Sequence, residues 1–67
     1  MKIRLNGQLT AMDEDVHTIE DLLKKLGYQG QVIAVAVNRS FLPRSQYASR
    51  LLEENLEIEI VSPMAGG

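Results

Sequence analysis

The sequence predicts an α+β fold, in which one mixed sheet of four or five strands packs on a single main helix. Apolar and polar residues alternate at the start of the chain and again near its end, which is typical of half-buried strands. Between these segments, Ile19, Leu22, Leu23 and Leu26 follow helical spacing. With 67 residues, the chain is long enough for one hydrophobic core and therefore for one domain.

The first two predicted strands form a hairpin around Asn6-Gly7. A two-residue loop would turn Leu9 to the opposite face of the sheet from Ile3. A three-residue loop, with Gly7 in the left-handed conformation, would place both side chains on one face. We therefore predict the three-residue loop.

The helix is predicted over residues 19–26, and both of its ends are marked by capping residues. Thr18 is a natural N-cap, and Asp21 three residues later completes a pair resembling a capping box. Gly27 suits the C′ position, where the backbone is left-handed.

Three further strands are expected after the helix. The continuous apolar run 32–37 predicts a central strand with both faces largely covered. A turn at 38–39 leads to a short strand at 41–42, which Pro43 ends because proline cannot donate to a ladder. Residues 44–52 are expected to form a loop with a helical turn.

The last strand is predicted from the alternation of apolar residues with Glu57 and Glu59 over residues 56–60. The resulting order of strand, strand, helix, strand, short strand and strand suits a β-grasp (ubiquitin-like) plan. We expect the domain to comprise residues 1–61 and to be followed by a flexible tail of residues 62–67.

Composition excludes several classes of function. Seven basic and nine acidic residues are interspersed along the chain, which leaves no basic stripe for nucleic acid. There is no cysteine, no signal peptide and no apolar run long enough to span a membrane. We therefore expect a cytoplasmic protein that binds neither nucleic acid nor membranes and is a monomer when free.

The sequence contains no arrangement of residues typical of an active site. It lacks a glycine-rich phosphate loop, paired catalytic carboxylates and a nucleophile with a histidine partner. His17 has no second metal ligand at a recognisable spacing. We expect no catalytic residue, no metal site and no stably bound cofactor, and hence a protein that is not itself an enzyme.

The two terminal glycines are the most specific feature of the sequence. Two glycines end a chain by chance in about 0.5% of cases at average glycine usage. Pro63 stops the preceding strand, and the six residues from Ser62 can extend up to about 20 Å. Without Cβ atoms, Gly66 and Gly67 can enter a narrow channel and expose the terminal carboxylate. A carboxylate needs activation before acyl chemistry, and adenylation by a partner that uses ATP would supply it.

Apolar residues near the start of the tail are candidates for a docking surface. Phe41, Leu42 and Val61, together with Met64, would form an exposed patch suited to a partner. Phe41 and Leu42 are equally compatible with simple core positions. Tyr28 and Tyr47 are interpreted as aromatic residues that cover the core.

The chain resembles the ThiS family of bacterial thiamine-biosynthesis sulfur carriers along its whole length. The resemblance rests on the order and spacing of four segments: Val35–Asn38, Leu42–Arg44 with an aromatic at Tyr47, Leu56–Ile60 and Gly66-Gly67. It implies that an E1-like adenylyltransferase forms an acyl-adenylate on Gly67. Sulfur from a cysteine desulfurase relay would then displace AMP, and thiazole synthase would receive sulfur from the thiocarboxylate. Gly66, Ala65 and Met64 would line the path into each partner.

Two alternatives stay open. The same tail chemistry would serve molybdopterin, cysteine or tRNA thiolation in related carriers. The chain would otherwise be a ubiquitin-like protein modifier joined to lysines, or a non-covalent binding module.

Overall fold

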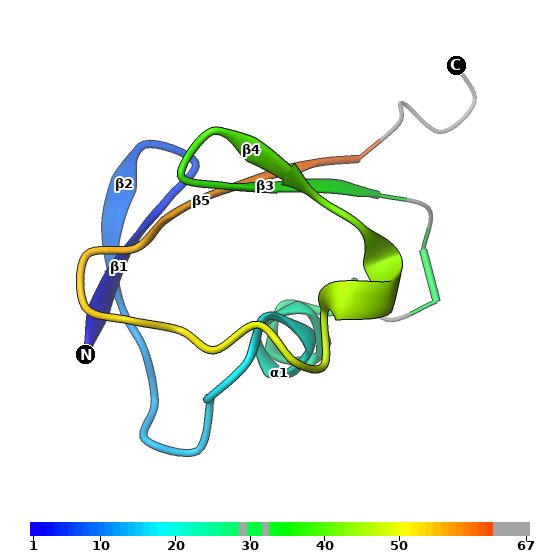
Figure 1. Cartoon of the computed structure of the whole chain (residues 1–67). Coiled ribbons are helices and arrows are strands. Elements are labelled where there is room, and N and C mark those ends of the chain that lie inside the picture. Colours follow the sequence, from blue (N-terminus) through cyan, green and yellow to red (C-terminus); the bar gives the residue numbers. More distant parts are fainter. Residues whose placement is uncertain (29, 32, 63–67) are drawn as a thin grey trace.

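The computed structural model describes residues 1–28, 30–31 and 33–62, and it shows a five-stranded sheet arched over one helix (Figure 1). The elements in chain order are β1 (Lys2–Leu5), β2 (Gln8–Ala11), α1 (Ile19–Lys25), β3 (Ala34–Val37), β4 (Ser40–Leu42), the 3-10 helix η1 (Arg44–Gln46) and β5 (Glu57–Val61). The predicted α+β class, with one mixed sheet on one main helix, is confirmed.

The strands lie in the order β2-β1-β5-β3-β4, so β5 is the central strand. It runs parallel to β1 and antiparallel to β3, and the two outer pairs are antiparallel hairpins. The prediction of a central strand in the run 32–37 is confirmed in that β3 lies between β5 and β4, but the prediction that both of its faces are largely covered is wrong. Strand β3 begins at Ala34 and buries only Val35 and Val37, while Ala34 is exposed and Ala36 is half-buried. Ala34 and Ala36 point to the outer face of the sheet. Because alanine is also apolar, the sequence of β3 is apolar on both faces although only the face with Val35 and Val37 is buried.

The β1–β2 hairpin has the two-residue loop, so the predicted three-residue loop is also wrong. Leu5 lies opposite Gln8, and Leu9 lies opposite Arg4 on the outer face with 53% of its surface exposed. Asn6 and Gly7 have φ values of 48° and 84°, the positive pair that a type I′ turn requires. The backbone of a type I′ turn matches the right-handed twist of the two strands. The stabilisation from this match outweighs what burial of Leu9 at the edge of the sheet would contribute.

Helix α1 has the predicted capping box. The Asp21 backbone N–H donates to Thr18 Oγ1 at 3.1 Å, and the Thr18 N–H donates to Asp21 Oδ2 at 3.2 Å. A further hydrogen bond from the His17 N–H is the largest factor that lowers the pKa of the Asp21 carboxyl, with the Thr18 donors adding to it. Gly27, with φ of 84°, follows the C-cap as expected. The local sequence therefore determines where this helix begins and ends.

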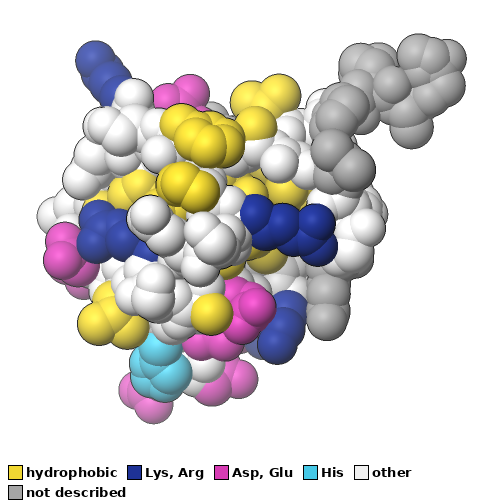
Figure 2. Space-filling view, turned by 45° about the vertical axis from the view of Figure 1, so that its right-hand side comes forward, with side chains coloured by type: hydrophobic (Ala, Val, Ile, Leu, Met, Phe, Trp, Pro, Cys, Tyr) yellow, Lys and Arg dark blue, Asp and Glu magenta, His cyan; other side chains and the backbone are white. Residues whose placement is uncertain are grey.

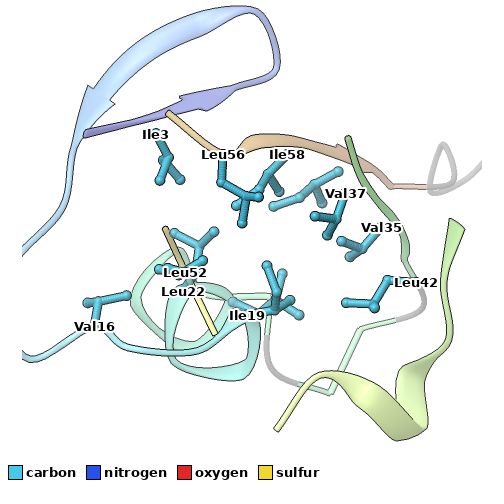
Figure 3. Packing of buried hydrophobic residues seen from close by; sticks show 12 residues of the cluster. Ile3, Val16, Ile19, Leu22, Val35, Val37, Leu42, Leu52, Leu56 and Ile58 are labelled. Carbon is cyan, nitrogen blue, oxygen red and sulfur yellow. The ribbon is translucent and has the colours of Figure 1, made fainter. Parts of the chain in front are cut away.

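The hydrophobic core lies between α1 and the inner face of the sheet (Figure 3). Ile3 of β1, Ile58 of β5 and Ile19 and Leu22 of α1 are fully buried. The other buried hydrophobic residues are Val16, Leu23, Val35, Val37, Leu42, Leu52, Leu56 and Ile60. Tyr28 and Tyr47 are half-buried against this cluster, which confirms that both cover the core. No helix of the described residues is long and apolar enough to cross a membrane.

Candidate functional site: the base of the predicted tail

The predicted tail follows the central strand of the sheet. Val61, the last residue of β5, lies opposite Ala34 in the antiparallel ladder with β3. Ser62 is exposed and is the last residue that the structure describes. The predicted tail residues Met64, Ala65, Gly66 and Gly67 lie outside the described residues. The base of the tail therefore follows the central strand of the sheet and is paired with β3 at Val61.

The three predicted docking residues that the structure describes, Phe41, Leu42 and Val61, are divided between the two faces of the sheet. Val61 is 64% exposed and Phe41 is 70% exposed, and both lie on the outer face, away from α1. Leu42 is only 7% exposed and belongs to the core, so its assignment to the docking surface is wrong. Successive residues of a strand point to opposite faces, so Phe41 and Leu42 could not both face outward in β4.

An apolar patch surrounds the base of the tail on the outer face of the sheet. We call it the outer-face patch and define it as Ala34, Ala36, Phe41 and Val61. Phe41 lies opposite Ala36 in the β3–β4 ladder, as Val61 does opposite Ala34 in the β3–β5 ladder. The four residues line a shallow hollow of about 390 Å³ together with Val35, Arg39 and Glu59. Small alanines between two large apolar side chains leave room for a partner's side chain.

Sequence reasoning missed the two alanines and the charged residues at the rim of the patch. The alternation of Ala34 and Ala36 with Val35 and Val37 was the available signal, because the larger residue of each pair faces the core. Arg39 is held near the sheet by Glu57, with 3.4 Å between Nε and Oε1, although its side chain is 82% exposed. Such an exposed pair contributes little stability and leaves the guanidinium accessible to a partner.

A second surface cavity, of about 430 Å³, lies on the helix side of the molecule. Leu23, Tyr28, Ile33 and Tyr47 line it, with Glu20, Lys24 and Arg44 among the charged residues around them. Figure 2 shows hydrophobic side chains among Lys and Arg side chains at the end of the molecule that the rotation brings forward. This mixture of both charges over apolar residues selects no particular ligand.

The described residues contain no group of three or more His, Cys, Asp or Glu side chains that could hold a metal ion. Among the described residues, two side chains have shifted pKa values, and both make structural contacts. One is the Asp21 carboxyl of the capping box. The other is Lys25, whose pKa is raised by its ion pair with Asp13, with 2.6 Å between Nζ and Oδ2.

Comparison with protein families gives a match to the family described as the ThiS family, over residues 3–67. The chain belongs to the ThiS family. The match includes the described domain as well as Gly66-Gly67, and it confirms the resemblance found in the sequence.

The solved structure of a thiamine biosynthesis protein (ThiS) from Geobacter metallireducens is similar to this ThiS-family chain over the whole length of both, with a TM-score of 0.82 and 23% identity. This similarity confirms the fold. Two curated proteins named thiazole synthase are 36% and 33% identical to this chain over 67 residues. They come from Magnetococcus marinus and Paramagnetospirillum magneticum, respectively. The chain spans 20% of the length of each.

Proposed function

We propose that this ThiS-family chain is a sulfur carrier of thiamine biosynthesis and that Gly67 carries the sulfur as a thiocarboxylate. The family match over residues 3–67 is the observation that supports this most strongly, since it includes Gly66-Gly67 and the domain that precedes them. The described domain has a packed hydrophobic core and an exposed residue at the end of β5, which suits a protein that presents a tail to other proteins.

The chemistry divides between the carrier and its partners. The carrier contributes the Gly67 carboxylate, and an E1-like adenylyltransferase contributes the site for ATP. Attack of the carboxylate on the α-phosphorus releases pyrophosphate and forms an acyl-adenylate. The terminal sulfur of a persulfide supplied by a cysteine desulfurase relay then displaces AMP and forms an acyl disulfide. A thiol of the partner attacks the other sulfur of that bond, which releases the thiocarboxylate and leaves a disulfide on the partner. Gly66, Ala65 and Met64 line the path into each partner, and the carrier itself needs no catalytic residue and no bound cofactor.

A thiazole synthase is the proposed acceptor of the sulfur. Two relatives that bear this name contain a segment similar to all 67 residues of this chain within a much longer polypeptide. A carrier-like segment within a polypeptide of that name supports a functional pairing of carrier and synthase. The lack of cysteine in this chain further supports a sulfur site on the terminal carboxylate and a cytoplasmic location.

The outer-face patch is the proposed docking surface for the adenylyltransferase. Phe41 and Val61 provide exposed apolar area beside the point where the chain leaves the sheet. A partner that covers this patch would hold the domain while residues 62–67 extend into its nucleotide site. Exposed Arg39 and Glu59 at the rim would set the orientation of docking.

Intact mass spectrometry tests the function directly. The protein is purified from its own cells, which establishes whether Gly67 is its last residue, and is then incubated with ATP, a sulfur source and the adenylyltransferase. We expect a gain of about 16 mass units, the difference between sulfur and oxygen, localised to Gly67 by fragmentation. An unchanged mass alongside an adenylyltransferase that is active on another carrier would contradict the proposal.

The acceptor requires a second experiment. Complementation of a strain that requires thiamine because it lacks its carrier would support thiazole formation. Formation of the thiocarboxylate without complementation would favour molybdopterin, cysteine or tRNA thiolation. Conjugates to lysine side chains, with no thiocarboxylate, would favour a protein modifier.

A further inference from the structure

The end of β5 is held from only one side by a neighbouring strand. On the β3 side the ladder continues to the pair formed by Ala34 and Val61. On the β1 side the paired residues stop at Leu5 and Ile58, because β1 ends there. The last rungs of β5 on this side therefore need another partner, and they lie directly before the predicted tail.

The side chain of Asn6 supplies this partner. Its Oδ1 accepts a hydrogen bond from the Ile60 backbone N–H at 2.8 Å, and the contact is partly buried. The Asn6 backbone N–H donates to the Ile58 carbonyl at 2.9 Å. The carboxamide thus continues the β1 side of the ladder by one rung beyond the end of the strand. Only a residue that tolerates positive φ and carries a short acceptor can do this from the first position of the turn.

Asn38 makes an equivalent contact at the other end of the same strand. It is the first residue of the two-residue turn between β3 and β4, and its φ of 49° nearly equals the 48° of Asn6. Its N–H donates to the Glu57 carbonyl at 2.8 Å, and its Oδ1 accepts from the Glu57 N–H at 3.1 Å. The two asparagines hold opposite ends of β5, and only Asn6 holds the end that leads into the tail.

We propose that Asn6 is a positioning residue for the carrier reaction, because it holds the end of β5 in place and so fixes where the tail leaves the domain. This inference rests on the proposed function. Without an acceptor, the Ile60 N–H loses its bond on the side where no strand follows, and the strand end opens locally. A loosened end must be ordered again when a partner binds, which weakens binding. Chemistry at Gly67 takes place within the partner, so the turnover of bound carrier stays the same.

Three variants isolate this contact. Asn6→Gly removes the side-chain acceptor and keeps a residue that accepts positive φ. Asn38→Gly makes the same change at the other end of β5 and is the matched control. Asn6→Asp retains an oxygen acceptor in a turn that tolerates aspartate. Urea unfolding of all variants identifies any difference in global stability, and such differences are subtracted before local effects are compared.

Amide hydrogen exchange followed by NMR measures the local effect without any partner. Asn6→Gly should speed exchange of the Ile60 amide by about fivefold or more and leave the Glu57 amide unchanged. Asn38→Gly should show the reverse pattern, and Asn6→Asp should restore protection at Ile60. Equal exchange of the Ile60 amide in the wild type and in Asn6→Gly would overturn the proposed clamp.

ATP–pyrophosphate exchange with the adenylyltransferase measures the functional effect. Asn6→Gly should raise the KM for the carrier by about three- to tenfold at unchanged kcat. Asn38→Gly should have the wild-type KM. Asn6→Asp should restore the KM from the raised value of Asn6→Gly to that of the wild type. Equal KM values for the two glycine variants would overturn the positioning role. A wild-type chain that is not adenylated would instead contradict the proposed function, and the hydrogen-exchange result would still decide whether Asn6 clamps β5.

Discussion

Phe41 and Leu42 are neighbours in β4, yet the first is 70% exposed on the outer face and the second is 7% exposed in the core. Substitutions at these two adjacent positions can therefore distinguish an effect on docking from an effect on folding. Phe41→Thr should change the free energy of unfolding by no more than about 0.5 kcal/mol, because threonine keeps a β-branched residue in the strand. Leu42→Ala should cost about 2–5 kcal/mol through loss of burial and the cavity left behind.

The functional readout for this pair is the KM for the carrier in the adenylation assay. We expect Phe41→Thr to raise the KM, since it removes the largest apolar side chain of the outer-face patch. Leu42→Ala should leave the KM unchanged at a temperature where the variant is fully folded. If Phe41→Thr binds the adenylyltransferase like the wild type, the outer-face patch is not the docking surface.

Deletion of Gly67 separates the chemistry of the tail from the stability of the domain. We expect adenylation to be abolished, because the reacting carboxylate then stands on Gly66, one residue short of its proposed position. The midpoint of urea unfolding should equal that of the wild type, because the buried core residues of the described chain all lie between Ile3 and Ile60. Adenylation at the wild-type rate after the deletion would show that Gly67 is not the reacting residue.

The register of the first hairpin can be tested by a matched pair of alanine substitutions. Leu9→Ala should change the free energy of unfolding by less than about 1 kcal/mol, since 53% of the leucine surface is already exposed. Ile3→Ala should cost about 2–5 kcal/mol, since Ile3 is fully buried. Similar losses for the two variants in urea unfolding would indicate the three-residue loop, which puts both side chains in the core.

The capping box predicts a specific dependence of stability on pH. The pKa of the Asp21 carboxyl lies below its ordinary value of 3.8 in the folded protein, chiefly because the His17 N–H donates to it. The stabilisation is therefore complete above pH 3.8 and is lost as the pH falls through the lowered pKa of the folded state. Asp21→Asn should be less stable than the wild type at neutral pH and should lose less stability on acidification.

The measurement is urea unfolding at several values between about pH 2 and pH 5. Glu14→Gln is the control, because it removes one carboxylate from the loop before α1 without changing the capping box. A stability curve for Asp21→Asn that runs parallel to the wild-type curve over this range would contradict the role assigned to the Asp21 carboxylate.

Local sequence was sufficient to predict an element where its hydrogen-bond partners are close neighbours in the chain. Thr18, Asp21 and Gly27 fix the ends of α1 through hydrogen bonds and backbone conformations that lie within a few residues of one another. The alternation over residues 56–60 likewise predicts β5, because a period of two places every second side chain on the same face. The significance of Gly66-Gly67 also came from the sequence alone and stays a prediction.

The tertiary structure decided which strand lies at the centre of the sheet and which side chains of its short strands face outward. A run such as 32–37 looks apolar on both faces, but its neighbours in the sheet depend on pairings with residues far along the chain. A three-residue strand such as β4 has too few residues to show which of Phe41 and Leu42 faces the core. The contact of Asn6 with Ile60 spans 54 positions, and no local pattern contains it. Local sequence determines backbone conformation, whereas long-range pairing determines which face and which neighbour each residue has.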